Sequence, residues 1–534
     1  MSGVGYRQLW AADPGGWRAA GAAWAGLTGP VDRRVAGLRT SGERLRSGWS
    51  GAAATAADTR LAGLRAELAS IAPALIEVDQ VLAELAGRLT VAKARLTEAV
   101  AQAEAAGLLV DRSGGVHPRV RPTDRAGAAA AGMAVAGVAA IVRDALDRAA
   151  AADRVAADRL DDLARAAGTG WASPPPPGRP ASGSAPSLVH AWWSGLTPAQ
   201  RRWLIGREPA LVGRLDGVPV AARDQANRLR LGVWREELLA ERRRLLARVP
   251  PGPLASIRLR GLAGRLTGLD ALVGRLTAGG APRAYLLGLD PAGEGRAVVA
   301  LGDPDHADRV LTYVPGMTAG LDDAPGELGR AARVLDRCAA LAPGERSAAV
   351  LWLDYDAPDL LTEAASAGQA RDAGPALHRF QEGLRVSHDG PPARQTVLGH
   401  SYGSLVVGVA AREHGLAADA LVFVGSPGVG ASHAGELGVP PGEVWASSAP
   451  DDVIRAARSA DELGRRALWG AAPLAAVLGW PAQTGHELWF GHDPSDPGFG
   501  GRVFDSGRGG HTGYWDPGNP ALDGMARVVL GRPL

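Results

Sequence analysis

Gln395-Thr-Val-Leu-Gly399-His400-Ser401-Tyr402-Gly403 is the stretch that decides the fold, because a short apolar run ends there in the pattern Gly-x-Ser-x-Gly. The helix-forming stretch Ser404 to His414 follows at once. A strand, a sharp turn and a helix in this order form a nucleophile elbow, which presents a serine at the end of the strand. Gly399 and Gly403 are the small residues that so crowded a turn requires. Ser401 is therefore the candidate nucleophile.

Acidic residues follow a later apolar run that should be a buried parallel strand. Two such runs come after the elbow, Ala420 to Gly425 and Glu443 to Ser447, and the second leads into Asp451 and Asp452. A carboxylate just past the end of a parallel strand lies on the same sheet edge as the elbow, where it can orient an imidazole. We favour Asp452, because the apolar residues after it should anchor the loop, and Asp451 stays open as the alternative. Aspartate is also a common N-cap, so both could instead begin a helix over residues 453–468.

A histidine follows in a glycine-rich loop near the end of the chain. Gly509-Gly-His511-Thr-Gly-Tyr-Trp515 comes directly after a short strand-like run, residues 501–504. Nothing helical surrounds this histidine, so a loop should present it. Nucleophile, acid and histidine in this chain order are the arrangement of an α/β-hydrolase, so Ser401, Asp452 and His511 are the predicted catalytic triad.

An oxyanion hole needs two backbone amides, one from the residue after the nucleophile and one from an earlier loop. Tyr402 supplies the first. The strand-like run Arg309 to Val314 ends in a Pro-Gly loop, where Gly316 or Met317 would supply the second. A Pro-Gly pair also marks ordinary turns.

Composition narrows the class of protein. The 534 residues suggest two to four domains, and the 46% of hydrophobic residues can bury a sizeable core. A formal net charge of +2 implies neither a nucleic-acid nor a membrane-surface partner. The single cysteine, Cys338, excludes a disulfide framework and a cysteine-based zinc site, and the predicted triad needs no metal or cofactor. We expect no Sec signal peptide and no transmembrane segment.

Composition also divides the chain. Residues 168–187 contain four consecutive prolines from Pro174 to Pro177 and should form a stiff, extended linker. Residues 1–167 repeat apolar positions with helical period and are predicted to form a bundle. Residues 188–280 are predicted to be a helical, cap-like segment, and residues 281–534 the catalytic domain. Three tryptophans in the first region fall seven residues apart and should fill a helix-packing seam: Trp10, Trp17 and Trp24.

The first part of the chain contains a predicted helical hairpin. One helix should run from Asp13-Pro14 to about Ser47, and a second from Ala52 toward Leu109, with Trp49-Ser50-Gly51 at the bend. Over residues 1 to about 110 this hairpin resembles the WxG helical-hairpin family associated with type VII secretion. The resemblance implies pairing with a helical WxG-type protein. The family's export signal, Tyr-x-x-x-Asp/Glu after the second helix, is missing, and the one match, Tyr355 to Asp359, lies far downstream.

A second resemblance covers about residues 188 to 517. The phrases that carry it are Leu211 to Pro219, Arg223 to Arg228, Trp352 to Pro358, the elbow, and His511 to Asp516. They resemble, in order, a bacterial α/β-hydrolase family of unknown function. The resemblance implies a serine-hydrolase fold with Ser401, Asp452 and His511 in the triad positions, and it implies no substrate.

Strand-like runs and helical stretches alternate from residue 281 onward, which predicts a mostly parallel eight-stranded sheet covered on both faces. The first two runs, Ala284 to Leu289 and Arg296 to Leu301, should pair as an antiparallel hairpin. The predicted function is hydrolysis of a small carboxylic ester, although the same triad also serves amides. The alternative is an interaction or effector protein associated with type VII secretion, with the hydrolase fold as toxin or scaffold. We expect the protein in the cytoplasm, or exported by a type VII-like rather than a Sec route.

Overall fold

The structure, a computed structural model, describes residues 4–121, 123–168, 178–181, 183–247, 253–278, 282–293, 295–317, 319–358, 363–456 and 487–533. The chain divides into two compact units. The helical unit contains residues 1–175, 198–206 and 277–283, and the sheet unit contains residues 176–197, 207–276 and 284–534. The predicted prolines 174–177 and most of the predicted helix 453–468 lie outside the described residues.

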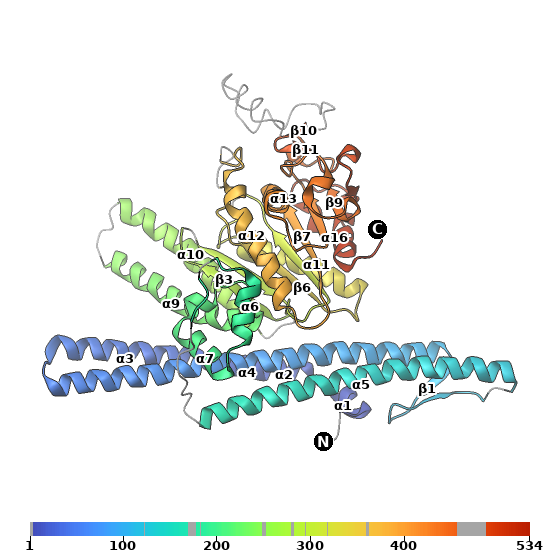
Figure 1. The fold of residues 1–534 in the computed structure, drawn as a ribbon, viewed down its shortest axis with the longest axis horizontal. Helices are drawn as coiled ribbons and strands as arrows, with labels where there is room; N and C mark the ends of the chain where they lie inside the picture. Colours follow the sequence, from blue (N-terminus) through green and yellow to red (C-terminus); the bar gives the residue numbers. More distant parts are fainter. Residues whose placement is uncertain are drawn as a thin grey trace. The chain divides into compact units, whose positions relative to one another are not determined.

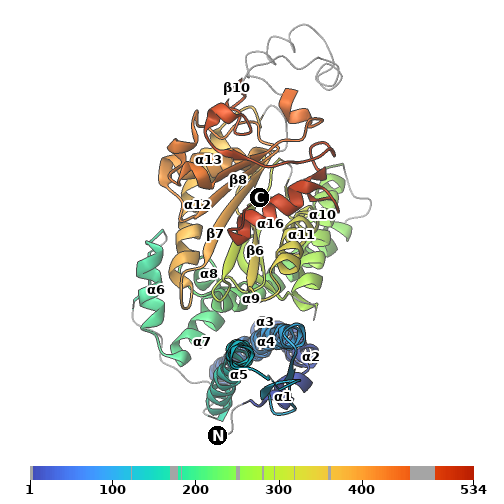
Figure 2. The same ribbon diagram turned by 90° about the vertical axis from the view of Figure 1, so that its right-hand side faces the viewer.

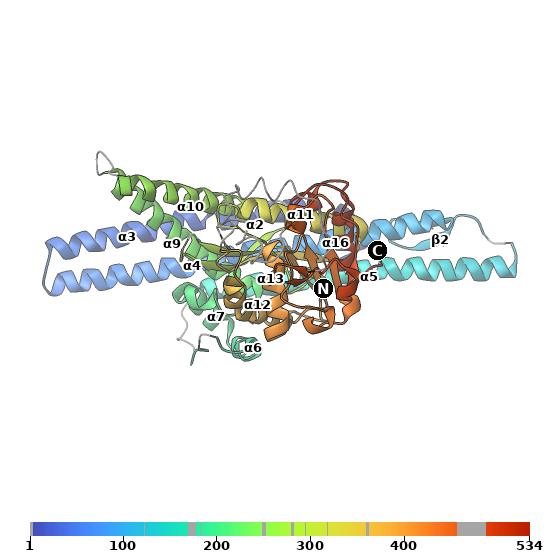
Figure 3. The same ribbon diagram turned by 90° about the horizontal axis from the view of Figure 1, so that it is seen from above.

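Two long helices form the framework of the helical unit, as Figures 1 and 3 show. Helix α4 (Ala52–Ala105) packs against α5 (Arg125–Gly168) along one half and against α3 (Thr28–Gly48) along the other. A small antiparallel pair, β1 (Leu108–Val110) and β2 (Val116–Pro118), connects α4 to α5. The shorter helices α1 (Tyr6–Ala11) and α2 (Pro14–Gly26) also contact α4.

The core of the helical unit follows from the spacing of leucine and alanine. On α4 these residues recur every three or four positions, which places them on one face of the helix. Valines and alanines of α5 recur at the same spacing and pack against them. The small alanine side chains let the two helices approach closely. The buried residues include Leu85, Leu89, Ala92, Leu96 and Ala99 of α4 and Val138, Val142, Ala145 and Ala149 of α5.

Two expectations for the hairpin are wrong. The first helix is not continuous, because it breaks at Leu27 between α2 and α3. Pro30 explains the break, since a proline lacks the amide hydrogen and clashes with the carbonyl four residues earlier. The tryptophans do not fill a buried seam: Trp10, Trp17 and Trp24 are 47%, 44% and 47% exposed.

Helix α5 differs from the other described helices in composition. Among the described residues it is the one helix long and apolar enough to cross a membrane, and 11% of its most apolar window is buried. Length and hydropathy are necessary for a membrane span but also describe alanine-rich helices of other proteins. The expectation of no transmembrane segment therefore stays a prediction.

An eight-stranded sheet organises the sheet unit, in the order β12-β9-β8-β7-β5-β6-β4-β3. Only β4 runs antiparallel to its neighbours β3 and β6, and the other pairs are parallel. This confirms the predicted mostly parallel sheet and its antiparallel first hairpin. The strands are β3 (Ala284–Asp290), β4 (Arg296–Leu301), β5 (Arg309–Val314), β6 (Ser347–Leu353), β7 (Arg394–His400), β8 (Ala420–Val424), β9 (Val444–Ser447) and β12 (Arg502–Val503).

Helices cover both faces of this sheet, as Figure 2 shows. Successive strand residues point to opposite faces, so each strand contributes to two separate cores. Leu311 of β5 packs toward α9, α10, α11 and α16, whereas its neighbour Val310 packs toward α12 and α13. The helices are α6 (Pro186–Ser194), α8 (Pro209–Val212), α9 (Val220–Leu246), α10 (Pro253–Thr277), α11 (Ala324–Leu341), α12 (Gly368–Ser387), α13 (Tyr402–His414) and α16 (Pro520–Leu530). Helix α7 (Pro198–Arg207) is grouped mainly with the helical unit.

Helix α9 is fastened to the edge strand β3 by buried polar side chains. Asp224 accepts a hydrogen bond from the amide of Leu286, and the side chain of Asn227 donates to the carbonyl of Leu286. Arg228 reaches the carbonyl of Ala284. These bonds satisfy backbone groups on an edge that would otherwise be unpaired. The segment predicted as cap-like thus supplies part of the layer over the β3 side of the sheet.

Gly408 of α13 is a position where packing demands glycine. A Cβ there would lie 2.0 Å from the carbonyl oxygen of Val429. We expect Gly408→Ala to lower the free energy of unfolding by about 1–3 kcal/mol, because the backbone of one element must shift. Gly329 in α11 is the matched control, since nothing lies within 4 Å of its Cβ position. Gly329→Ala should raise stability by about 0.5–1 kcal/mol in the same urea titration. Equal effects at both sites would contradict the packing argument.

Candidate active site

The turn between β7 and α13 holds Ser401 in a strained backbone conformation. Its φ is 53° and its ψ is −129°, and among the described non-glycine residues it alone has a positive φ. The amide of Ser401 donates to the carbonyl of Val424 at the end of β8. Such strain persists only where surrounding structure enforces it, and it is typical of functional positions. Here it lifts the serine out of the strand at the end where the parallel strands finish.

Glycines on either side make this turn possible. A Cβ on Gly399 would lie 2.6 Å from the carbonyl oxygen of Gly403 and 2.6 Å from the Cα of Ser404. A Cβ on Gly403 would lie 2.3 Å from the carbonyl oxygen of Val314. Only glycine fits either position, so the two flanking glycines of the motif have a steric reason.

The structure brings His511 and Asp452 together. His511 Nδ1 lies 2.8 Å from Asp452 Oδ1 and 3.1 Å from Oδ2. The carboxylate is fully buried, and the imidazole is 26% exposed. Gly425, next to the residue that holds the Ser401 amide, lies against both side chains, since its Cβ would be 2.8 Å from Asp452 Oδ2 and 3.2 Å from His511 Nδ1. The His511–Asp452 pair, called the dyad below, and the elbow therefore both lie at the carboxyl end of β8.

Within the described residues, the hydrogen bonds of His511 involve Asp452 and His400, and none joins its ring to Ser401. In enzymes without substrate the bond between base and nucleophile is often long and shortens when substrate binds. With Nδ1 directed to Asp452, the free ring nitrogen is Nε2. This is the nitrogen that a general base uses toward a serine.

Three donors hold the Asp452 carboxylate. Besides His511, the hydroxyl of Tyr514 donates to Oδ2 at 2.5 Å and the amide of Ile454 donates to Oδ1 at 2.9 Å. Burial raises the pKa of Asp452, but these hydrogen bonds outweigh it and hold the pKa below its ordinary value. Asp452 therefore stays ionised at neutral pH although it is buried.

Asp451, the alternative acid, has a different neighbour. Its carboxylate accepts a hydrogen bond from the amide of Gly509, at 3.3 and 3.2 Å to its two oxygens. This bond holds the loop that carries His511 and does not reach the imidazole. The two adjacent aspartates thus contact different parts of the same loop.

Tyr514 should stabilise the protein in a pH-dependent way. We expect Tyr514→Phe to lower the free energy of unfolding by about 1.5–3 kcal/mol at pH 7, because a buried carboxylate loses a donor. A lowered carboxyl pKa stabilises the folded state above the ordinary value of about 3.9 and this contribution disappears as pH falls through the lowered value. The difference between wild type and variant should therefore shrink below about pH 4. Urea denaturation at pH 7 and pH 3.5 measures it, and an unchanged difference would count against the role.

His400 supports the loop of His511 from the elbow. Its Nε2 donates to the carbonyl oxygen of His511 at 2.9 Å, and the two rings lie 4.8 Å apart between centroids. Its Nδ1 is buried and has no partner among the described residues. Burial, with the charges of His511 and Arg330 acting in the same direction, lowers the pKa of His400 to about 3. His400 is therefore neutral at pH 7 and adds no positive charge beside His511 and Asp452.

The residues predicted for the oxyanion hole lie beside Ser401. A Cβ on Gly316 would be 2.6 Å from Ser401 Cβ and 3.1 Å from its Oγ, so the loop after β5 lies against Ser401. Met317 follows in this loop and is partly buried. Tyr402 begins α13, which directs its backbone amide out of the helix terminus. The structure therefore gathers the elbow, the dyad and this loop at one end of the sheet.

Two contributors to the site were not predicted, Tyr514 and Tyr355. Tyr514 contacts Asp452, and the hydroxyl of Tyr355 donates to the carbonyl oxygen of Pro315 in the loop beside Ser401. Each tyrosine lay in a phrase that stood out in the sequence, three residues after His511 and three after Trp352. Proximity to these motifs was the one available signal.

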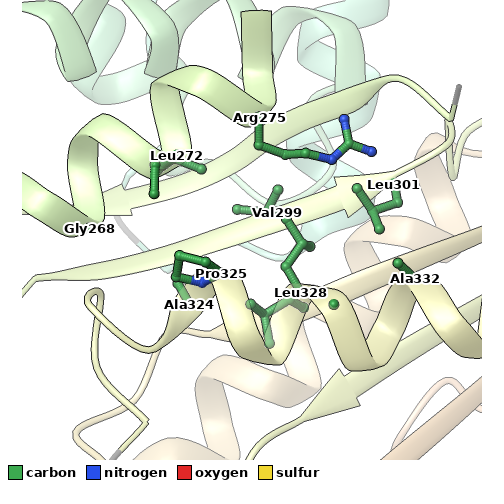
Figure 4. Close-up of a pocket in the computed structure, with 12 residues that line it drawn as sticks. Gly268, Leu272, Arg275, Val299, Leu301, Ala324, Pro325, Leu328 and Ala332 are labelled. Carbon is green, nitrogen blue, oxygen red and sulfur yellow. The ribbon is translucent and has the colours of Figure 1, made fainter. Parts of the chain in front are cut away.

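A cavity of about 190 Å³ lies elsewhere in the sheet unit, between α10, α11 and β4 (Figure 4). Its lining is apolar apart from Arg275, and it includes none of the residues around Ser401. Polar groups converge at Ser401, whereas the lining of this cavity contains no nucleophile, so Ser401 remains the candidate site. Among the described residues no three His, Cys, Asp or Glu side chains gather as a metal site.

Known proteins resemble parts of this chain. A family described as alpha/beta hydrolase matches residues 290–461. Rv2079, an uncharacterized protein of Mycobacterium tuberculosis, is 32% identical over 395 residues, which cover 67% of this chain and 56% of Rv2079. Rv0963c of the same organism, also uncharacterized, is 34% identical over 220 residues, which cover 39% of this chain and 79% of Rv0963c. The chain thus spans little more than half the length of Rv2079.

A solved structure was also found. The crystal structure of the esterase LipW from Mycobacterium marinum aligns with 56% of this chain and 88% of LipW, at 14% identity and a TM-score of 0.26.

Proposed function

Because this chain belongs to the alpha/beta hydrolase family, we propose that it is a serine hydrolase that cleaves a carboxylic ester through an acyl-enzyme. The observation that supports this most is the pair of hydrogen bonds between His511 and a fully buried Asp452, next to an elbow that strains Ser401. Buried charge is costly unless it is paired, so a carboxylate held in this way beside a partly exposed histidine favours a catalytic role.

The proposed reaction begins when Ser401 Oγ attacks the ester carbonyl and Nε2 of His511 accepts its proton. Asp452 keeps Nδ1 protonated and stabilises the imidazolium. As the tetrahedral intermediate collapses, His511 returns the proton to the departing alcohol. Water then attacks the acyl-enzyme with the same histidine as base, and the carboxylic acid leaves. An ester is the proposed substrate, because nothing in the described residues near the site resembles the extended subsites of a protease.

Negative charge develops on the carbonyl oxygen during both attacks. The amide of Tyr402 is the proposed first donor, and it lies at the amino-terminal end of α13, where the helix dipole also favours negative charge. The loop containing Gly316 and Met317 is the proposed source of the second donor, because it lies in contact with Ser401. Removing one such donor typically costs roughly 100- to 1000-fold in kcat.

Covalent labelling tests this proposal directly. The purified protein is incubated with a fluorophosphonate, digested and analysed by mass spectrometry, while turnover of p-nitrophenyl esters with two, four, eight and twelve acyl carbons is measured in parallel. We expect one adduct, on Ser401, and hydrolysis that stops in proportion to labelling. Heat-denatured protein is the control, because labelling that depends on the fold must disappear. An adduct on another residue, or hydrolysis that continues after complete labelling, would reject the proposal.

We also propose a second function for the helical unit, the binding of a helical partner. It rests on the exposure of Trp10, Trp17, Trp24 and Trp49, which are 44–47% exposed, since large exposed aromatic side chains are typical of binding surfaces. The full-length chain should co-purify with a small helical protein encoded beside it. Replacing three of these tryptophans by alanine should abolish this co-purification without affecting ester turnover. Retention of the partner by that variant would argue against the proposal.

A further inference from the structure

Tyr355 contacts the loop that lies against Ser401. It follows β6 and is 3% exposed. Its hydroxyl lies 2.6 Å from the carbonyl oxygen of Pro315 and 3.2 Å from that of Gly316. One hydroxyl group therefore donates toward two consecutive carbonyl oxygens of the same loop.

The position of this hydroxyl is fixed by its surroundings. The ring of Tyr355 stacks on that of Trp352, with centroids 6.0 Å apart and an angle of 8° between the planes, and Trp352 is completely buried. Burial raises the pKa of Tyr355 well above its ordinary value, so the hydroxyl keeps its proton and acts as a donor. A protonated donor on a packed ring is well suited to fix the carbonyl groups that it meets.

The direction of the loop's amides follows from these carbonyls. In a trans peptide the C=O and the N–H point in opposite directions. The carbonyl of Pro315 shares a peptide with the amide of Gly316, and the carbonyl of Gly316 shares one with the amide of Met317. Both carbonyls turn toward Tyr355 in the core, so both amides turn away from it, while the Cα between them contacts Ser401.

We propose that Tyr355 is a positioning residue that orients the Gly316 and Met317 amides toward the oxyanion of the substrate. This inference rests on the proposed serine-hydrolase function. Its basis is that Pro315 has no amide hydrogen of its own and that Gly316 is flexible, so the loop needs an external contact to fix its peptides. The hydroxyl supplies that contact through the carbonyl oxygens of Pro315 and Gly316.

Tyr355→Phe tests the proposal, because it removes the hydroxyl and keeps the ring on Trp352. We expect kcat for a p-nitrophenyl ester to fall about 10- to 100-fold while KM changes less than about twofold, since the lost contact acts on the transition state. The inhibition constant of an aryl boronic acid, whose tetrahedral adduct places an oxygen in the oxyanion hole, should rise by the same factor as kcat falls. A purely structural role would not link these two quantities.

Tyr313→Phe is the matched control. Tyr313 is also buried, on the strand that leads into the loop, and its hydroxyl donates to Glu327 at 2.5 Å. Tyr313→Phe should lower the free energy of unfolding about as much as Tyr355→Phe does, but it should keep kcat within about twofold of the wild-type value. Tyr355→Leu is the second variant: it should match Tyr355→Phe in kcat although it is less stable, if the hydroxyl is what matters.

The outcomes separate this inference from the proposed function. If the wild-type protein is neither labelled by fluorophosphonate nor able to hydrolyse the esters, both the proposed function and this inference are rejected. If the wild type is active and the Tyr355→Phe variant retains kcat and boronate affinity, only this inference is rejected. Equal losses in Tyr355→Phe and Tyr313→Phe would also overturn it, because they would indicate general destabilisation.

Discussion

Ser401→Ala should lower ester turnover by at least about ten-thousand-fold and abolish fluorophosphonate labelling. The variant lacks the oxygen that forms the proposed acyl-enzyme, so the remaining activity should come from binding and the proposed oxyanion hole alone. Alanine keeps the Cβ of serine, so the backbone at φ 53° is no more strained than before and the fold should be retained. Turnover of p-nitrophenyl acetate measures the loss of activity, and thermal unfolding measures whether the fold is retained.

Ser387→Ala is the matched control for this variant. Ser387 is a buried serine whose hydroxyl donates to Asp305 at 2.7 Å. Ser387→Ala should lower the free energy of unfolding by about 1–3 kcal/mol, because the buried Asp305 loses a hydrogen-bond donor, and it should retain turnover. Persistent hydrolysis by Ser401→Ala would mean that another residue is the nucleophile.

Asp452→Asn should lower kcat about ten-thousand-fold. The carboxylate accepts the Nδ1 hydrogen of His511, whereas an asparagine amide can donate to Nδ1 and so favour the other tautomer. Nε2 would then carry the proton and could not accept one from Ser401. The Tyr514 hydroxyl and the Ile454 amide donate to different oxygens, so the single oxygen of asparagine can accept from only one of them, and some loss of stability should accompany the loss of kcat.

Asp451→Asn distinguishes the two adjacent aspartates. Asp451 accepts from the Gly509 amide, and an asparagine oxygen can do the same. We expect this variant to lose less than about tenfold in kcat. If Asp451→Asn were the more damaging of the two, the roles proposed for the aspartates would have to be exchanged.

The fold was predictable because its signals are local. Buried parallel strands appear as short continuous apolar runs, and the predicted bounds of β4 and β5, Arg296–Leu301 and Arg309–Val314, agree with the structure. The elbow was predictable for the same reason, since the two glycines and Ser401 lie within five consecutive residues. The structure confirms the α/β-hydrolase fold that these patterns indicated.

The supporting contacts were not predictable, because they join residues far apart in the chain. Tyr514 reaches Asp452 across 62 positions, and Tyr355 reaches Pro315 across 40. In the sequence, neither tyrosine can be distinguished from an ordinary core residue. Only the tertiary arrangement gives its hydroxyl a partner. The spacing of Trp10, Trp17 and Trp24 misled for a related reason: periodicity defines a helix face, and the neighbouring helices decide whether that face is covered.

The strained backbone at Ser401 implies that the proposed catalytic role and the stability of the fold favour different residues at this one position. A non-glycine residue in such a conformation costs on the order of 1–3 kcal/mol, which is a sizeable fraction of the net stability of a domain. Selection for folding alone should therefore replace this serine with glycine, and selection for catalysis should restore it. In a library screened first for thermal resistance and then for turnover, position 401 would be where the two populations diverge most.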